Sequence, residues 1–354
     1  MTWAGDPYKP PAARLLVGMT RRSASPVSAY LQEQGFAAMV SANSLWVPEA
    51  RLRGGEIRPG YFRPSTYEGA LIPAALDSAG YVAMRAGGYR WTPEQYVEMV
   101  FQGTAQATRG DFVWTWLWWA SMDYCVEPQL AHSRARVEER IERTAETLGE
   151  ILDLVDAWRA GRHGFVGQWI GTVVPDPVPV IQGWLPGDYE RSAELTAQVL
   201  ASRSRPWPPL VGVGSVCRRH LRGPGGLLQV LPAVAAAVPA FEAGEPDLRW
   251  AFHGQWPWRE EATSDWPTRW PVGLHLFGIK GGLVPALGAL IPGRIASVDS
   301  MAWAVAARHE AGQLRQGGRR EVTADYRLKV AHLDRWVQRQ LATGAFAGAR
   351  SEGD

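Results

Sequence analysis

Cysteine is scarce in this 354-residue sequence, which contains only Cys125 and Cys217. Two cysteines exclude a framework of several disulfide bonds and a structural zinc site made mainly of cysteine. Cys125, Cys217 and His220 also lack the spacing that is typical of metal ligands. We therefore expect a protein of a reducing compartment, with no metal and no redox cofactor.

A large excess of charge of one sign is also missing, because 37 basic residues face 35 acidic ones and the net charge is +2. A nearly neutral chain can bind nucleic acid only through a local basic patch. The sequence has no apolar run of about 18 residues, and residues 1–16 lack the apolar segment of a secretory signal. These absences predict a soluble, cytoplasmic protein.

What the sequence does contain is a set of short apolar or β-branched runs, each closing on small or polar residues. There are eight of them, at 14–20, 37–43, 70–78, 112–121, 177–183, 209–215, 272–279 and 294–300. Stretches with helical spacing of apolar residues lie between several runs, at 92–107, 137–160 and 185–202. This alternation is typical of parallel βα units. Eight strands favour a closed (β/α)₈ barrel, or TIM barrel, over an open doubly wound sheet, and we expect one catalytic barrel domain over residues 1–354.

Two regions interrupt the alternation. Residues 241–271 contain five tryptophans together with prolines and mixed charges, and we interpret them as an ordered insertion that follows a helix. Residues 304–343 have helical character, and we expect a frayed tail at 344–354.

Polar or small residues stand where five of the predicted strands end. In a barrel the carboxyl ends of the strands build the active site. Each residue alone also fits a helix cap or a turn, but the set would converge on one face. The residues are Asp77, Asp123, Gln182, the pair Gly214 and Ser215, and Asp299. By contrast, His275 lies within an apolar strand, and we expect it to be a core histidine.

The same strand ends resemble motifs of the tRNA-guanine transglycosylases. LDSAGYVAM (76–84) resembles D-S-G-G-F-Q-V, with Ala79 and Tyr81 in place of glycine and phenylalanine. Further similarities follow in the same order: MDYCVEP (122–128) to F-D-E-C, VIQGW (180–184) to V-Q-G-G, VGVGSVC (211–217) to I-G-G-L, LHLFGIK (274–280) to H-L-F-G, and SVDSMAWAVAAR (297–308) to F-D-C-V-M-P-T-R. The resemblance covers residues 37–310, and six motifs in order make it specific.

One departure from the tRNA enzymes identifies a branch. Those enzymes carry a C-x-C-x-x-C…H zinc site after the last strand, whereas this sequence has no cysteine beyond Cys217. The forms MDYCVEP, GVGSVCRR and DSMAW are similar to the 7-deazaguanine DNA transglycosylases, the DpdA-like branch known from phages and bacterial modification islands. The resemblance implies exchange of guanine in DNA for a 7-deazaguanine base such as preQ0. Three alternatives stay open: the same exchange on tRNA, a glycoside hydrolase with two carboxylates, and an inactive nucleic-acid-binding relative. The oligomeric state is also open, with a homodimer as one option.

The resemblance also implies a role for each site residue. Asp299 would be the nucleophile that holds the deoxyribose covalently, and Asp77 the second carboxylate, which manages protons on the leaving and entering bases. Asp123 would accept hydrogen bonds from the ring N–H and the amino group of guanine. The other residues of the base pocket would be Tyr81 as a stacking ring, Cys125 as a lining residue, and Gln182, Gly183, Gly214 and Ser215.

Three arginines follow the strand end at 209–215, on the same predicted face as the site. We predict that Arg218, Arg219 and Arg222 contact the DNA phosphates, with ordinary solvated arginines as the alternative. We expect the tryptophan-rich insertion, with Arg259 and Arg269, to join this DNA-facing rim. Because it follows a helix, however, the insertion would begin at the opposite face unless it folds back.

Overall fold

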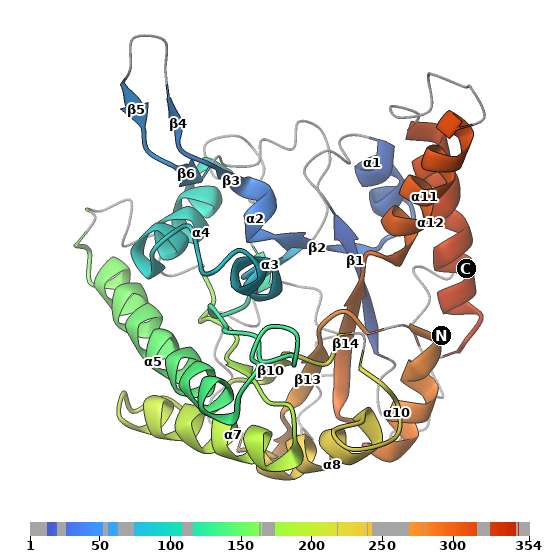
Figure 1. Cartoon of the computed structure of the whole chain (residues 1–354). Coiled ribbons are helices and arrows are strands. Elements are labelled where there is room, and N and C mark those ends of the chain that lie inside the picture. The colour runs from blue at the N-terminus through green and yellow to red at the C-terminus, as the bar shows by residue number, and fades with distance from the viewer. Residues whose placement is uncertain are drawn as a thin grey trace, which may run out of the picture.

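Each of the eight apolar runs contains one strand of a single parallel sheet (Figure 1). The computed structural model describes residues 13–19, 26–51, 56–62, 74–107, 116–162, 164, 174–217, 219–238, 240–242, 269–279, 281–316, 326–344 and 346. The strands are β1 (Arg14–Met19), β2 (Ala37–Ser41), β7 (Ala74–Asp77), β8 (Trp116–Trp119), β9 (Val180–Ile181), β10 (Leu210–Val213), β13 (Gly273–Leu276) and β14 (Ile295–Ser300). Their order across the sheet is β8-β7-β2-β1-β14-β13-β10-β9, and every neighbouring pair is parallel.

The two edges of this sheet are joined to each other. A parallel bridge links Ala120, just after β8, to Val178, just before β9. The N–H of Ser121 donates to the Val178 carbonyl (2.8 Å), and the N–H of Val178 donates to the Trp119 carbonyl (2.8 Å). Strands that follow chain order around a sheet and then close on themselves form a (β/α)₈ barrel, so the predicted fold is confirmed.

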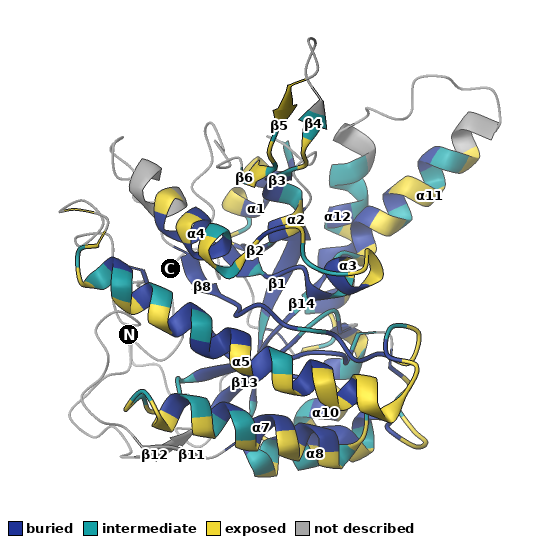
Figure 2. Ribbon diagram, turned by 60° about the vertical axis from the view of Figure 1, so that its left-hand side comes forward, coloured by how far each residue is buried: buried dark blue, intermediate teal, exposed yellow. Residues whose placement is uncertain are grey.

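Helices surround the barrel. They are α1 (Pro26–Glu33), α2 (Ala42–Leu45), α3 (Gly80–Arg85), α4 (Pro93–Ala107), α5 (Arg134–Arg159), α7 (Pro186–Ala201), α8 (Leu227–Ala237), α10 (Val284–Leu290), α11 (Ala302–Gln316) and α12 (Tyr326–Leu341), with a short 3₁₀ turn η1 (Gly281–Leu283). Figure 2 shows buried residues on the faces of α5 and α7 that turn toward the sheet and exposed residues on their outer faces. This pattern follows from the helical spacing of apolar residues in the sequence. Among the described residues, no helix combines the length and apolarity needed to span a membrane.

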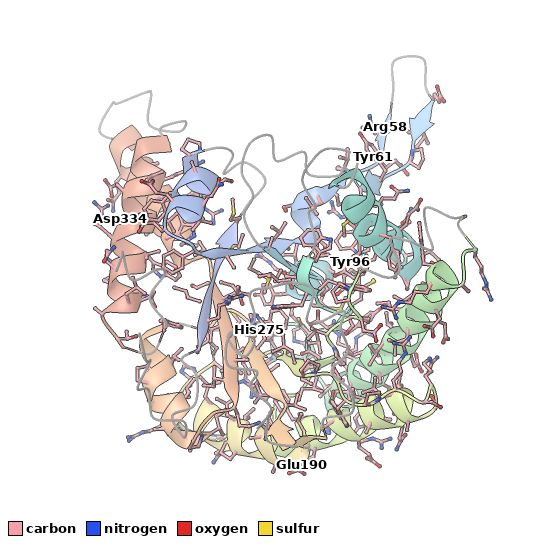
Figure 3. The ribbon with its side chains drawn as sticks, turned by 180° about the vertical axis from the view of Figure 1, so that it is seen from behind. Arg58, Tyr61, Tyr96, Glu190, His275 and Asp334 are labelled. Atoms are coloured by element: carbon pink, nitrogen blue, oxygen red, sulfur yellow. The ribbon has the colours of Figure 1, made fainter. Side chains whose placement is uncertain are left out.

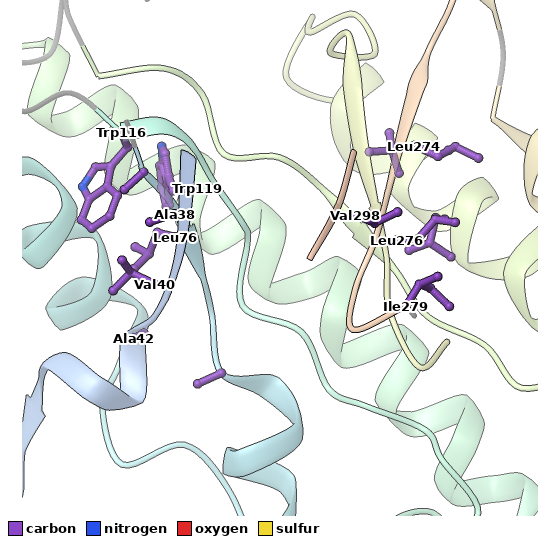
Figure 4. Packing of buried hydrophobic residues seen from close by; sticks show 14 of the residues in the cluster. Ala38, Val40, Ala42, Leu76, Trp116, Trp119, Leu274, Leu276, Ile279 and Val298 are labelled. Atoms are coloured by element: carbon purple, nitrogen blue, oxygen red, sulfur yellow. The ribbon is translucent and has the colours of Figure 1, made fainter. Parts of the chain in front are cut away.

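Side chains that alternate along the strands supply two separate parts of the core. In β1, Leu15 and Val17 pack outward against the helices, while Leu16 packs into the barrel interior with Met39 and Trp118. Figure 4 shows the outward layer, in which Trp116 and Trp119 of β8 lie beside Val40 and Leu76. Alternation of faces along each strand therefore explains why near-continuous apolar runs mark all eight strands.

An antiparallel arm leaves the barrel between β2 and β7, and the sequence analysis did not predict it. It comprises β3 (Trp46–Val47), β4 (Ala50–Arg51), β5 (Ile57–Arg58) and β6 (Tyr61–Phe62), with β3 paired to β6 and β4 paired to β5. β4 and β5 project beyond the barrel in Figure 1, and Figure 3 labels Arg58 and Tyr61 there. At its base the ring of Phe62 contacts those of Trp46 (4.9 Å) and Trp91 (5.1 Å). Because β3 begins beyond the carboxyl end of β2, the arm belongs to the face on which barrel active sites lie.

The tryptophan-rich insertion is described only at its two ends. These form an antiparallel pair, β11 (Ala240–Glu242) and β12 (Arg269–Pro271), whereas residues 243–268 lie outside the described residues. β12 runs directly into the amino end of β13, so the stem lies at the opposite end of the barrel from the carboxyl strand ends. The predicted placement of the insertion on a DNA-facing rim therefore has no support at its stem, and Arg259 falls outside the described residues.

The predicted helical tail is present as α11 and α12. The Tyr30 hydroxyl of α1 donates to Asp334 of α12 (2.8 Å), which ties the tail to the start of the chain. The last predicted stretch, 344–354, lies outside the described residues except for Gly344 and Phe346. Phe346 is buried and forms a parallel bridge with Ala13.

Candidate active site

Three aspartates come together at the carboxyl end of the barrel. Asp77 is the last residue of β7, Asp123 follows β8, and Asp299 lies near the end of β14. The negative charges of Asp123 and Asp299 both raise the pKa of Asp77, which places the three carboxylates near one another. Strand ends that are far apart in the sequence therefore converge, as their shared position in a parallel barrel predicts.

The pKa of Asp77 lies near neutral pH. Burial, followed by the charges of Asp123 and Asp299, raises its pKa to about 7. Hydrogen bonds from the Ala79 backbone and the Ser41 side chain act in the opposite direction. A carboxyl group with such a pKa is present in both protonation states near neutral pH, which suits a group that gives and takes a proton.

Asp123 lies at the centre of a buried hydrogen-bond network. Its carboxylate accepts hydrogen bonds from the Ser78 hydroxyl and from the side-chain amide of Gln182, and the Cys125 thiol lies 3.4 Å from Oδ2. The Tyr89 hydroxyl fixes the backbone at this position, since it donates to the Asp123 carbonyl (2.8 Å) and accepts from the Asp123 N–H (3.0 Å). Burial raises the pKa of Asp123, while these side-chain donors lower it. A carboxylate held in this way keeps its orientation and still has lone pairs for a ligand.

Small residues around Asp123 and Gln182 make room for these polar side chains. A Cβ atom on Gly80 would lie 2.5 Å from the Asp123 Oδ1 atom and 2.6 Å from the Asp123 carbonyl oxygen. A Cβ atom on Gly214 would collide with the side-chain amide of Gln182. Gly80 must therefore be small to admit Asp123 itself.

A second part of the buried hydrogen-bond network consists of Gln182, Ser215 and Glu127. The Ser215 hydroxyl lies 2.6 Å from the Gln182 Oε1 atom and 3.1 Å from the Glu127 Oε2 atom, and it accepts from the N–H of Val126 (2.9 Å). Burial raises the pKa of Glu127. Ser215 adopts a left-handed backbone conformation (φ 54°), which aims its hydroxyl at Gln182 and Glu127. The contact between the Ser215 hydroxyl and Oε1 therefore fixes which way the Gln182 amide points, with the NH₂ group toward Asp123.

The structure also places the other predicted lining residues. Tyr81 lies on α3, is partly buried, and packs on a cluster that contains Met84 and Cys125. Cys125 is buried. A Cβ atom on Gly183 would lie 2.6 Å from the ring of Tyr189, whose hydroxyl donates to the Gly214 carbonyl (2.8 Å). Tyr189 thus contacts both Gly183 and Gly214, the two glycines that lie close to Gln182.

Asp299 has a different environment from Asp123. The Gly278 N–H donates to its Oδ1 atom (2.7 Å), and the Nε2 atom of His275 lies 3.4 Å from the same oxygen. Figure 3 shows His275 near the middle of the barrel. The burial of His275 agrees with the sequence analysis, but its proximity to Asp299 was not predicted.

The three arginines predicted to contact phosphate have different positions. Arg219 is buried, and its guanidinium donates to the carbonyls of Gly183 (2.8 Å), Trp184 (2.8 Å), Ser215 (2.7 Å) and Gly225 (2.9 Å). It also stacks on the Trp184 ring at 4.1 Å. The prediction for Arg219 is therefore corrected, because its donors are already committed to the loops after β9 and β10.

Arg222 is exposed, and its proposed role in phosphate binding stays a prediction. Arg218 lies outside the described residues.

The sequence analysis missed four residues that support the site: Ser78, Tyr89, Glu127 and, in its relation to Asp299, His275. Ser78 and Glu127 stand inside the quoted motifs LDSAGYVAM and MDYCVEP, so their proximity to strand ends was a usable signal. Within the described part of the chain, no group of three or more histidine, cysteine, aspartate or glutamate side chains has an arrangement that could hold a metal ion.

Comparison with known proteins gives one family. The family model described as DeoxyPurine in DNA protein A, DpdA, matches residues 61–253, a range that includes Asp77, Asp123, Gln182 and Ser215. No curated protein gives a significant match.

Two solved structures are similar over almost the whole chain, each at 11% sequence identity. One, from Coccidioides immitis, is described as a fructose-1,6-biphosphate aldolase and has a TM-score of 0.40, with 96% of this chain and 93% of that chain covered. The other is the YdjI aldolase from Escherichia coli K12, with a TM-score of 0.37 and coverage of 96% and 94%. Similarity at this level carries no argument about the chemistry of the site.

Proposed function

Since the chain belongs to the DeoxyPurine in DNA protein A family, we propose that it is a DNA-guanine transglycosylase, which exchanges guanine in DNA for a 7-deazaguanine base such as preQ0. The observation that carries the proposal is the convergence of Asp77, Asp123 and Asp299 at one end of the barrel. Two carboxylates can exchange a base on one sugar, and the third can recognise the base.

The proposed reaction proceeds by double displacement. A carboxylate oxygen of Asp299 forms a bond to C1′ of the deoxyribose as the bond from C1′ to N9 of guanine breaks and its electron pair goes to the base. Protonated Asp77 gives its proton to the departing guanine. The entering base then attacks C1′ through N9, the bond to Asp299 breaks, and Asp77 takes the N9 proton back. The pKa of about 7 supports Asp77 in this double role, because both protonation states are populated at neutral pH.

Asp123 and Gln182 are the proposed base-recognition groups. Guanine and the 7-deazaguanines present a ring N–H beside an amino group, and one carboxylate can accept from both. Burial raises the pKa of Asp123, so a ligand that donates two hydrogen bonds would favour its ionised form. Adenine lacks this pair of donors and would leave a buried carboxylate unsatisfied.

The target guanine must leave the base stack to reach this site. Asp123 and Gln182 are buried, so a base paired within a duplex cannot contact them. We therefore infer that the enzyme binds an extruded or single-stranded nucleotide. Tyr81, which packs on the cluster that contains Met84 and Cys125, is the ring that we propose to stack on the base.

An exchange assay on two substrates tests the proposal. Duplex DNA and tRNA are each incubated with the protein and labelled preQ0, and the nucleosides are analysed by mass spectrometry. We expect the label in deoxynucleosides from DNA, with release of one guanine for each base inserted. Labelled tRNA alone would assign the protein to tRNA exchange, release of sugar without base exchange would indicate a hydrolase, and DNA binding without either product would indicate an inactive relative.

A further inference from the structure

The two oxygens of the Asp299 carboxylate are not equivalent. In the described part of the chain, the protein donors that approach this carboxylate, the Gly278 N–H at 2.7 Å and His275 Nε2 at 3.4 Å, both face Oδ1. The side chain retains 15% exposure. Oδ2 is therefore the oxygen left for a bond to substrate.

His275 is held in a fixed orientation. It lies on β13, is fully buried, and pairs across the sheet with Ser297 of β14. Its Nδ1 atom lies 2.8 Å from the Ser297 hydroxyl, and its ring packs between Trp118 (4.7 Å) and Phe277 (4.5 Å). A ring with these contacts cannot turn its Nε2 atom away from Asp299 without breaking them.

The surroundings of His275 favour a hydrogen on its Nε2 atom. Nε2 is buried and forms no hydrogen bond, and the Oδ1 atom of Asp299 lies 3.4 Å from it. A lone pair on Nε2 would face a negative oxygen, whereas an N–H there would be attracted to it. The Ser297 hydroxyl can donate to Nδ1, which leaves the hydrogen on Nε2. The charge of Asp299 and the position of Ser297 thus favour the same arrangement.

We propose that His275 is a positioning residue for Asp299, an inference that rests on the proposed base exchange. The Gly278 N–H binds Oδ1 and the His275 Nε2–H is directed at the same atom, so that Oδ2 is the oxygen that attacks C1′. In the covalent intermediate Oδ1 becomes the carbonyl oxygen of the ester, with both donors directed at it. When the entering base breaks the bond between Oδ2 and C1′, negative charge returns to the carboxylate, and the two N–H groups stabilise that charge.

Two substitutions of His275 distinguish the effect of its N–H group from the effect of its ring packing. His275→Phe keeps an aromatic ring between Trp118 and Phe277 but removes the N–H, whereas His275→Gln offers an amide N–H near the position of Nε2. We expect the Phe variant to slow decay of the covalent adduct, measured in single turnovers with preQ0, by about tenfold to a hundredfold, because no N–H then faces the charge that returns to Asp299. The dissociation constant for guanine should stay within about twofold of wild type, since His275 does not contact Asp123 or Gln182. Loss of a hydrogen bond to the bound guanine would raise the dissociation constant far more. The Gln variant should recover part of the rate.

The outcomes are distinct. Adduct decay at the wild-type rate in His275→Phe would overturn the inference, and so would an equal loss in the Phe and Gln variants, because the N–H would then not matter. As a second route, Ser297→Ala should slow decay and Ser297→Thr should not, since threonine keeps the hydroxyl that selects the tautomer. If the wild-type protein forms no adduct and exchanges no base, the proposed function fails, a result separate from any effect at His275.

Discussion

At the scale of single residues, the site depends on an aspartate that is costly to ionise. Between pH 4 and pH 7 the folded chain holds a proton on Asp77 that the unfolded chain has already lost, because the folded pKa is about 7. Stability therefore falls as the pH rises through this window, and the loss persists above it. Proton transfer requires Asp77 to ionise, whereas ionisation of Asp77 lowers the stability of the fold.

This conflict predicts the behaviour of Asp77→Asn. The variant should lose base exchange, because an amide cannot carry the proton, and yet should gain stability over wild type by about 1–3 kcal/mol above pH 7. At pH 4 the difference should shrink toward zero. Thermal unfolding of both proteins at pH 4 and pH 8 measures it, and a difference that is the same at both values would show that Asp77 does not titrate as its surroundings indicate.

Gly80 provides a second prediction at this scale. Gly80→Ala would place a methyl group 2.5 Å from the Asp123 Oδ1 atom, so the carboxylate must move. We expect guanine binding to weaken by about tenfold or more, since one charged hydrogen bond is lost. Gly312→Ala in α11 is a matched control, because a Cβ atom there meets nothing within 4 Å. Guanine binding by Gly80→Ala that equals binding by the control would mean that the Asp123 carboxylate tolerates displacement.

At the scale of elements, two loops are joined by one buried arginine. Arg219 donates to carbonyls in the loop between β9 and α7 and in the loop between β10 and α8. Arg222, only three residues on, is exposed. Substitution by alanine should therefore affect mainly stability at Arg219 and mainly DNA binding at Arg222.

Arg219→Ala should lower the free energy of unfolding by about 2–4 kcal/mol, because several buried carbonyls lose their donor. The salt dependence of DNA binding by its folded fraction should not change. Arg222→Ala should leave stability within about 0.5 kcal/mol and, if Arg222 contacts a phosphate, reduce the slope of log K against log salt by about one. Chemical denaturation and a salt titration of DNA binding check both variants. A reduced slope for Arg219→Ala would reinstate it as a phosphate contact, and unchanged slope and affinity for Arg222→Ala would remove Arg222 from the DNA interface.

The elements themselves were predictable to different degrees. The eight barrel strands are buried on both faces and leave apolar runs in the sequence, so each was located. The four strands of the arm are two residues long and rely on contacts such as Trp46 with Phe62, which no local pattern reveals. Arg219 was predicted on the loop after β10, where it lies. Its burial depends on carbonyls of the loop after β9, and the sequence alone does not show that the two loops are in contact.

At the scale of the whole molecule, barrel closure makes the site predictable in outline. Asp77, Asp123, Gln182, Ser215 and Asp299 were chosen as strand ends, and the barrel gathers those ends on one face. The family membership inferred from six ordered motifs is confirmed by the match to residues 61–253. Sequence order cannot show distances across the barrel, so the link from Glu127 to Ser215 and the approach of His275 to Asp299 emerged only in the structure.

If Asp299 is the nucleophile of base exchange, it must form a covalent bond to the deoxyribose of DNA, and that bond can be mapped. Protein and guanine-containing DNA are incubated without a replacement base, denatured, digested, and analysed by mass spectrometry for a peptide that carries deoxyribose. We expect the modification on the peptide that contains Asp299, its loss when preQ0 is added before denaturation, and its absence from Asp299→Asn. Modification of Asp77 instead, or base exchange at the wild-type rate in Asp299→Asn, would contradict it.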